Sequence, residues 1–262
     1  MADGSLIALS GALIAVLMPL PANAEDAHKP AAEVVISNDR AATCYDGRTG
    51  ASVRPMLVRS QVLVAPDGKH RAYIESLAAT GLKLPSRTGG WLSPECANVT
   101  HVFVADSPSE EFRQVLTLAP TEDTLGNAIR LVDWSPNGRY LLLEATMFQW
   151  ASDFGDSDPV IYDARTDSAT DPSLLYRAFK RRVGRDCVVS LKPVGFSSDG
   201  KVMLEAGPSY PFAPESDQPE SNSCLKSPGT WAYDPEAGNF TGSQANYTIR
   251  HFGTFEGGAI RK

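Results

Sequence analysis

The sequence predicts an all-β protein, a small β-propeller-like array of four-stranded antiparallel blades. A strand–turn–strand pattern with a central glycine occurs three times, and a second pattern, a strand ending on Asp, recurs in step with it. The 21 Gly and 19 Pro among 262 residues also suit a chain of many short strands and turns. Repetition at a long period indicates units that bury their apolar faces only against their neighbours.

Each copy of the first pattern runs from an apolar strand through a turn into a second strand that ends near a Glu. The copies span Val62–Ser76, Leu131–Thr146 and Pro193–Gly207. A glycine in each turn supplies the positive φ that β-branched or bulky residues resist. These glycines are Gly68, Gly138 and Gly200.

Each hairpin is followed by a third strand that ends on Asp, within residues 101–112, 159–170 and 230–241. We expect a fourth strand at Gln114–Leu118, at Leu174–Phe179 and after Asn239. Four antiparallel strands per repeat form the blade of a propeller. The sequence therefore predicts three full modules.

The two ends of the domain are expected to close the array. Residues 42–59 include Thr43–Gly50, which resembles the third-strand pattern at Tyr162–Asp167. We expect this segment to pair with the tail, residues 245–257, as a composite fourth blade that leaves no open sheet edge. The alternative is an open arc that a partner or a second copy completes.

The turns also carry a family resemblance. Trp134–Tyr140 and Phe196–Lys201 resemble the WD40-like repeats of TolB-type β-propellers, whereas Val64–Lys69 keeps only the turn. Members of that broad group are periplasmic binding proteins or the propeller halves of peptidases and lyases. The resemblance implies an architecture with a binding face, and it names no reaction.

Residues 1–24 have the features of a secretory signal peptide. Leu6–Leu20 is an apolar run, and Ala22 and Ala24 are small residues at a cleavage site. One feature departs from the pattern, because the first five residues carry Asp3 and no Lys or Arg. A membrane anchor is the competing interpretation, but the run is shorter than the roughly 20 residues of a spanning helix. We expect a periplasmic or secreted protein with no stable membrane anchor after cleavage, a flexible mature N-terminus over residues 25–41, and one domain over residues 42–262.

The four cysteines predict disulfide bonds. An even count of four cysteines in an exported chain favours two disulfides over a zinc site, because no pair has CxxC spacing. Of three possible connectivities we favour Cys44–Cys96 and Cys187–Cys224.

The chain has 24 Lys and Arg against 31 Asp and Glu, and it shows no basic stripe, so we expect no nucleic-acid partner.

Long segments between the second and third strands are the candidate functional regions. They cover residues 77–100, 147–158 and 208–229, and in a propeller all three emerge on the same face. Aromatic side chains in ordered loops on one face are typical of a protein-binding surface. The alternative is that the rings pack onto the edge of the propeller. The predicted binding residues are Trp91, Phe148, Trp150, Phe154, Tyr210 and Phe212.

Catalytic chemistry has little support in the sequence, so no catalytic residue, metal or cofactor is assigned. There is no Gly-x-Ser-x-Gly motif, and the four histidines lack metal-ligand spacing. Residues 153–158 are interpreted as a solvated acidic turn, with calcium binding left open. Glu75, Glu144 and Glu205 are expected to face solvent at strand ends.

The sequence therefore predicts an exported protein-binding module whose partner is another envelope or secreted protein. One alternative is a periplasmic hydrolase or lyase acting on envelope glycan or peptide, with His70, His101 or His251 as acid or base. Another is an inhibitor or immunity-type protein that neutralises a secreted hydrolase.

Overall fold

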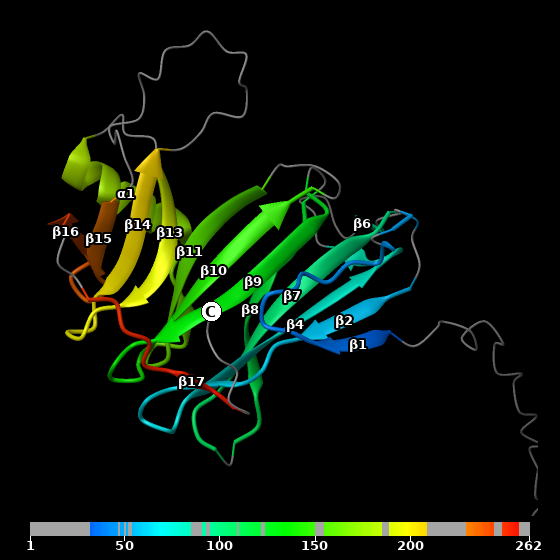
Figure 1. The fold of residues 1–262 in the computed structure, drawn as a ribbon, viewed down its shortest axis with the longest axis horizontal. Coiled ribbons are helices and arrows are strands. Elements are labelled where there is room, and N and C mark those ends of the chain that lie inside the picture. Colours follow the sequence, from blue (N-terminus) through cyan, green and yellow to red (C-terminus); the bar gives the residue numbers. More distant parts are fainter. Residues whose placement is uncertain are drawn as a thin grey trace, which may run out of the picture. The chain divides into compact units, whose positions relative to one another are not determined.

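The computed structural model describes residues 32–46, 48–49, 51, 54–84, 91–92, 95–108, 110–121, 124–149, 155–184, 189–208, 229–243 and 248–256 (Figure 1). The signal peptide predicted for residues 1–24 lies outside these ranges. So do Cys187 and Cys224, the second disulfide that the sequence predicts.

Three four-stranded antiparallel modules make up most of the fold, which is all-β and propeller-like as predicted. The first contains β3 (Leu63–Val64), β4 (Arg71–Ala79), β7 (Ala97–Ala105) and β8 (Arg113–Leu118). The second contains β9 (Gly126–Trp134), β10 (Tyr140–Phe148), β11 (Gly155–Asp163) and β12 (Ser168–Ala169). The third contains β13 (Val189–Phe196), β14 (Val202–Pro208), β15 (Gly229–Asp234) and β16 (Asn239–Ser243). A small hairpin of β5 (Lys83–Leu84) and β6 (Trp91–Leu92) lies between β4 and β7 in the chain.

The predicted turns are confirmed, because Gly68, Gly138 and Gly200 have φ values of 68°, 71° and 84°. The fourth strand expected at Gln114–Leu118 is β8, and the one expected after Asn239 is β16.

The prediction of a strand at Leu174–Phe179 is wrong, because this segment lies in helix α1 (Pro172–Val183). The Asp171 side chain caps the helix by accepting the backbone N–H of Ser173 at 2.8 Å, and Pro172 occupies the first turn. Leu175, Ala178 and Phe179, at helical spacing, are the buried residues. The fourth strand of the second module is instead the short β12.

The composite fourth blade is not present among the described residues, because both chain ends join the first sheet. β2 (Met56–Arg59) pairs with β4, and β1 (Glu33–Ile36) pairs in parallel with β2. β1 therefore lies within the segment expected to be flexible. β17 (Thr254–Phe255) pairs with β3.

β2 and β3 together form the first strand of the first module, with a break between them. At the break, the Ser60 hydroxyl accepts the backbone N–H of Ile74 at 2.8 Å, and the Ser60 N–H donates to the Ile74 carbonyl at 2.9 Å. Because residues 56–64 complete the first module in this way, they are not free to start another blade.

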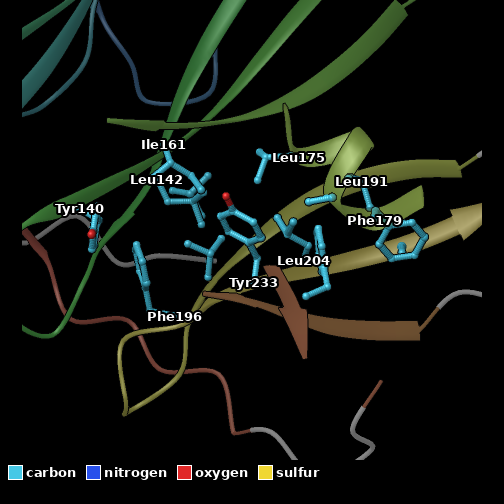
Figure 2. Close-up of a cluster of buried hydrophobic side chains, with 14 of the residues drawn as sticks. Tyr140, Leu142, Ile161, Leu175, Phe179, Leu191, Phe196, Leu204 and Tyr233 are labelled. Carbon is cyan, nitrogen blue, oxygen red and sulfur yellow. The ribbon is translucent and has the colours of Figure 1, made fainter. Parts of the chain in front are cut away.

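The middle sheet is buried on both faces, since alternate residues of β10 join different clusters. Leu142 packs with residues of α1, β13 and β14 between the second and third sheets, where Figure 2 shows it beside Ile161. Leu141 and Leu143 pack with residues of β3, β4 and β7 between the first and second sheets. Burying a Leu side chain contributes about 1.5–3 kcal/mol, so these two layers supply most of the driving force for folding.

The C-terminal segment, residues 249–256, contacts all three modules in turn. The Arg250 N–H donates to the Phe196 carbonyl of the third module at 3.2 Å. The N–H groups of Phe252 and Gly253 donate to the buried Asp133 carboxylate of the second module at 3.0 and 2.9 Å. β17 then joins the first module, and Figure 1 shows the segment crossing the lower ends of the sheets.

The predicted disulfide Cys44–Cys96 is confirmed and closes a separation of 52 residues. A closed loop of this size contributes about 4 kcal/mol in the chain-entropy model. The bond indicates an oxidising, extracytoplasmic environment.

α1, the helix in the described part of the chain, lacks the length and apolar character of a membrane-spanning helix.

Candidate binding surface

The outer face of the first sheet is the face turned away from the second module. Along β4 the exposed fraction alternates residue by residue, so Arg71, Tyr73, Glu75 and Leu77 share this face. The strand register adds residues from β1, β2 and β7 to it. These residues are Val34, Ile36, Leu57, Arg59, Val99, His101 and Phe103.

Partly buried aromatic rings lie at the centre of the outer face. The Tyr73 and Phe103 rings stack with centroids 4.9 Å apart, and Phe112 meets Tyr73 edge-on at 4.8 Å. The guanidinium of Arg71 lies 4.9 Å above the Phe112 ring, and that of Arg59 lies 5.4 Å from the Tyr73 ring. Partial burial raises the pKa of the Tyr73 hydroxyl, so it stays protonated and can donate a hydrogen bond.

The same face is buried in the other two modules. The hairpins close on equivalent hydrogen bonds, to the carbonyls of His70, Tyr140 and Lys201. The residues three positions after these carbonyls are Tyr73, Leu143 and Leu204. They therefore occupy equivalent positions in the three hairpins. Both leucines are 0% exposed, Leu143 against the first module and Leu204 against the second. In the described part of the chain no preceding sheet covers Tyr73 in this way.

The prediction that Glu75, Glu144 and Glu205 end their strands is wrong, because they lie within β4, β10 and β14. Two of the three form cross-strand ion pairs. Glu75 pairs with Arg59 of β2 at 2.5 Å, and Glu144 pairs with Arg130 of β9 at 2.6 Å. Glu205 is opposite Lys192 in the register of β14 and β13. The hydrogen bond from Arg59 to Glu75 is the main reason that the pKa of Arg59 is raised. The glutamates therefore belong to separate strand pairs and do not form a ring.

The predicted binding residues are only partly described. Trp91 lies in β6, and Phe148 lies at the end of β10, where its ring covers Gly126 of β9. An added Cβ at Gly126 would clash with that ring, so Phe148 packs on its own sheet. The remaining predicted residues lie outside the described part of the chain. They are Trp150, Phe154, Tyr210 and Phe212.

Sequence reasoning missed the aromatic residues of the outer face, because they lie in strands and not in the long loops that are typical of binding surfaces. Their signal is the unbroken run Ala72-Tyr73-Ile74, in which apolar residues occupy both faces of a strand. A strand with one solvated face alternates between apolar and polar residues. Such a run therefore predicts a sheet with two covered faces.

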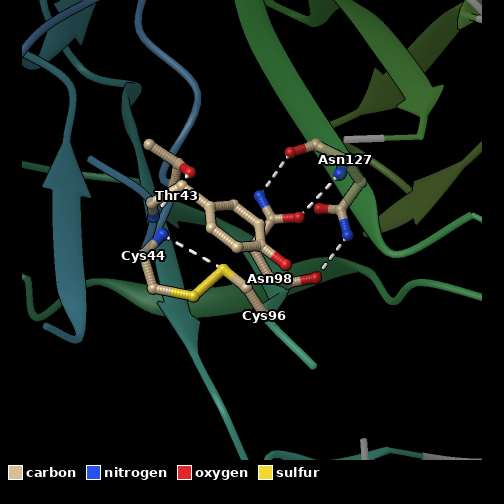
Figure 3. The surroundings of a disulfide bond; sticks show 6 residues. Thr43, Cys44, Cys96, Asn98 and Asn127 are labelled. Carbon is tan, nitrogen blue, oxygen red and sulfur yellow. Dashed lines mark hydrogen bonds between the residues drawn. A yellow bond between two sulfur atoms is a disulfide. The ribbon is translucent and has the colours of Figure 1, made fainter. Parts of the chain in front are cut away.

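A buried polar network joins the first and second modules near the disulfide. Asn98 of β7 and Asn127 of β9 exchange side-chain and backbone hydrogen bonds, one of them from the Asn127 N–H to the Asn98 amide oxygen at 2.6 Å (Figure 3). The Thr100 hydroxyl donates to the Asn127 side-chain oxygen at 2.7 Å. Since the donors and acceptors are paired within the protein, this network fixes the angle between sheets rather than forming a reactive site.

Titratable residues do not assemble into a catalytic group among the described residues. His70 Nδ1 lies 3.0 Å from an Asp67 oxygen, and His101 Nδ1 lies 2.9 Å from the Thr117 hydroxyl. The described part of the chain contains no group of three or more His, Cys, Asp and Glu arranged to hold a metal ion.

No protein-family model matches this chain, and no curated protein matches it at a significant level. The resemblance to TolB-type propellers therefore stays a prediction.

Proposed function

We propose that the chain is an exported protein-binding module, in the periplasm or secreted, and that its partner docks on the outer face of the first sheet. The observation that carries the proposal is the equivalence of Tyr73 with Leu143 and Leu204, which are buried by a neighbouring sheet. Because sheets cover the equivalent positions in the other modules, the partner is an envelope or secreted protein that presents a β-sheet.

The composition of the face fits this role. Aromatic residues and Arg are enriched at the centres of protein interfaces, and this face holds Tyr73, Phe103 and Phe112 beside two arginines. Val34 and Ile36 of the same face are 60% and 61% exposed, and exposed apolar patches mark interaction sites. An inhibitor of a secreted hydrolase would use the same face and differ only in its partner.

The hydrolase or lyase alternative finds two histidines beside carboxylates among the described residues: His70 Nδ1 lies 3.0 Å from Asp67, and His251 Nδ1 lies 3.5 Å from the buried Asp133. The Asp67 carboxylate also accepts the N–H of Lys69 within its own turn, which is the expected role of Asp there. The Asp133 carboxylate likewise accepts the backbone N–H groups of Phe252 and Gly253, so both contacts have structural roles and binding is the better supported function.

The test is capture of partners from the cell envelope by the mature protein, followed by affinity measurement with the purified partner. Tyr73→Ser/Phe103→Ser should weaken binding at least about 30-fold, the effect of losing a typical interface hot spot. Leu174→Ser is the matched control, since Leu174 is an apolar residue 45% exposed on α1. It should change affinity less than about twofold.

Three results would contradict the proposal. One is a captured partner that binds the double variant and the control equally well. Another is a folded wild-type protein that captures nothing. A double variant that loses its cooperative unfolding transition would show that the rings are core residues, which also contradicts the proposal.

A further inference from the structure

Helix α1 concentrates positive charge in a chain of the opposite charge. The helix contains four cations and no Asp or Glu, whereas the whole chain has a net charge of −7. These four residues, which we call the basic patch, are Arg177, Lys180, Arg181 and Arg182. The three cations of the last turn interact favourably with the carbonyl end of the helix dipole. Arg177 lies one turn earlier, so the dipole does not account for it.

The basic patch faces solvent, because the helix buries its opposite side. Leu175 and Phe179 belong to the core between the second and third sheets, where Figure 2 shows them. At 3.6 residues per turn, Arg177, Lys180 and Arg181 lie on the other side of the helix. Within the patch only Lys180 is partly buried, and the other three residues are exposed.

Ion pairs do not neutralise the patch. No salt bridge joins its cations to a carboxylate among the described residues. β16, which packs against α1, has the sequence Asn-Phe-Thr-Gly-Ser and carries no carboxylate. The Asp163 carboxylate of β11 pairs with Arg139. A hydrogen bond from the Ser173 N–H is the main reason that the pKa of the helix-capping Asp171 is lowered, and the charge of Arg177 adds to the effect.

An exposed apolar side chain lies within the patch. Leu174 is 45% exposed, and its spacing from Arg177 and Arg181 places the three on one side of the helix. Exposed cations alone attract any polyanion, whereas a leucine beside them gains free energy only from an apolar contact. A surface that combines negative charge with an apolar layer beneath it satisfies both, and an anionic lipid bilayer has this structure.

The shape of the patch also favours a membrane over an acidic protein. An arginine recognises a protein carboxylate best through two parallel hydrogen bonds, which require a fixed geometry. The patch instead lies on the convex surface of a helix, and no ion pair among the described residues holds its side chains in place. Long cationic side chains of this kind suit headgroups that move within the plane of a bilayer.

We propose that the basic patch and Leu174 bind the anionic surface of a lipid bilayer and hold the protein reversibly at the membrane. The helix does not insert, because its apolar side remains in the core. This inference goes beyond the proposed function, since it needs neither Tyr73 nor Phe103. α1 packs against the third module, whereas the docking face belongs to the first sheet, so a protein partner and a membrane can be bound together.

The experiment measures binding of the mature protein to lipid vesicles by co-sedimentation. Vesicles of phosphatidylglycerol and phosphatidylcholine in equal parts should bind it, and vesicles of phosphatidylcholine alone should not. Each basic residue near an anionic surface strengthens binding about fivefold, so Arg177→Gln/Arg181→Gln should weaken binding about 25-fold. Glutamine is a good helix former, so this variant keeps α1. Binding of the wild type should fall as the salt concentration rises, because exposed charges are screened.

Two control variants assign the binding to the patch. Arg40→Gln/Arg54→Gln removes the same charge from exposed residues between β1 and β2, and it should change binding less than about twofold. Leu174→Ser leaves the charge unchanged and should weaken binding at least about fivefold, because the apolar contact is lost. Equal binding to the two kinds of vesicle, equal losses in the two double arginine variants, or unchanged binding of Leu174→Ser would each overturn the inference. An acidic peptide that binds the patch when the vesicles do not would also overturn it.

The Tyr73→Ser/Phe103→Ser variant separates this inference from the proposed function. It should bind the anionic vesicles as the wild type does while losing the captured protein. A captured protein partner with no vesicle binding overturns only the membrane inference. Vesicle binding with no captured protein overturns only the docking face.

Discussion

Replacing Asp133 tests whether the C-terminal segment holds the modules together. The carboxylate is 0% exposed and accepts the N–H groups of Phe252 and Gly253. Hydrogen bonds to a charged group contribute about 1.5–3 kcal/mol each, so the two bonds amount to about 3–6 kcal/mol. Removing a buried charge recovers part of its desolvation cost. We therefore expect Asp133→Ala to lower the free energy of unfolding by about 3–5 kcal/mol.

The assay is urea unfolding followed by tryptophan fluorescence, with linear extrapolation to water. Trp134 reports on this region, because it is buried and its indole N–H donates to the Leu63 carbonyl at 3.1 Å. Asp133→Asn keeps the shape and one acceptor oxygen, so it should cost about half as much as Asp133→Ala. The same substitutions are then made in a chain that ends at Thr248.

The truncation completes a double-mutant cycle. If Asp133 acts through the C-terminal segment, Asp133→Ala should cost at least about 2 kcal/mol less in the truncated chain, since interacting sites are not additive. Costs that agree within about 0.5 kcal/mol in the two backgrounds would refute the reasoning, because independent sites add within that margin.

Two further predictions concern turns and pH. Gly68 and Gly138 have φ of 68° and 71°, but a Cβ at Gly68 meets nothing within 4 Å whereas one at Gly138 lies 2.7 Å from the Asp67 carboxylate. Gly68→Ala should cost about 1–2 kcal/mol and Gly138→Ala at least about 1 kcal/mol more, measured by urea unfolding; equal costs would contradict the clash. Hydrogen bonds from Arg139 at 2.9 and 2.7 Å lower the pKa of Asp163, so this pair stabilises the fold above the unfolded pKa of about 3.9, and the contribution disappears as the pH falls through the folded pKa. The wild type should therefore lose more stability than Asp163→Asn between about pH 6 and pH 2.5, and equal losses would show that the pair contributes nothing.

The local features of the fold could be predicted from the sequence, because they depend on neighbouring residues. A turn that needs a positive φ selects glycine, as at Gly138, and the Asp that follows each third strand marks the next turn. The start of α1 was also readable, since Asp171-Pro172 is a helix N-cap followed by a first-turn proline. The strand prediction there gave too much weight to the repeat and too little to the spacing of Leu175, Ala178 and Phe179.

The partners of isolated polar residues could not be predicted in the same way. Asp133 stands in an apolar strand and accepts the N–H of the adjacent Trp134, but it also accepts the backbone N–H groups of two residues about 120 positions later, which leave no mark on side-chain identity. The outer face is a similar case. Tyr73 has the sequence pattern of a core residue, and it is uncovered only because no described sheet precedes the first module. The disulfide could be predicted, because the side chains that form it are visible in the sequence as two cysteines.

The pairing of β17 with β3 also imposes an order in time on folding. Phe255 pairs with Leu63, so another 192 residues must be added to the growing chain after Leu63 before this pair can form. At a synthesis rate of about 5–20 residues per second, that takes about 10–40 s. During this interval the β3 edge has no strand beside it, and a chaperone or export factor that recognises extended chain can bind there before the fold closes.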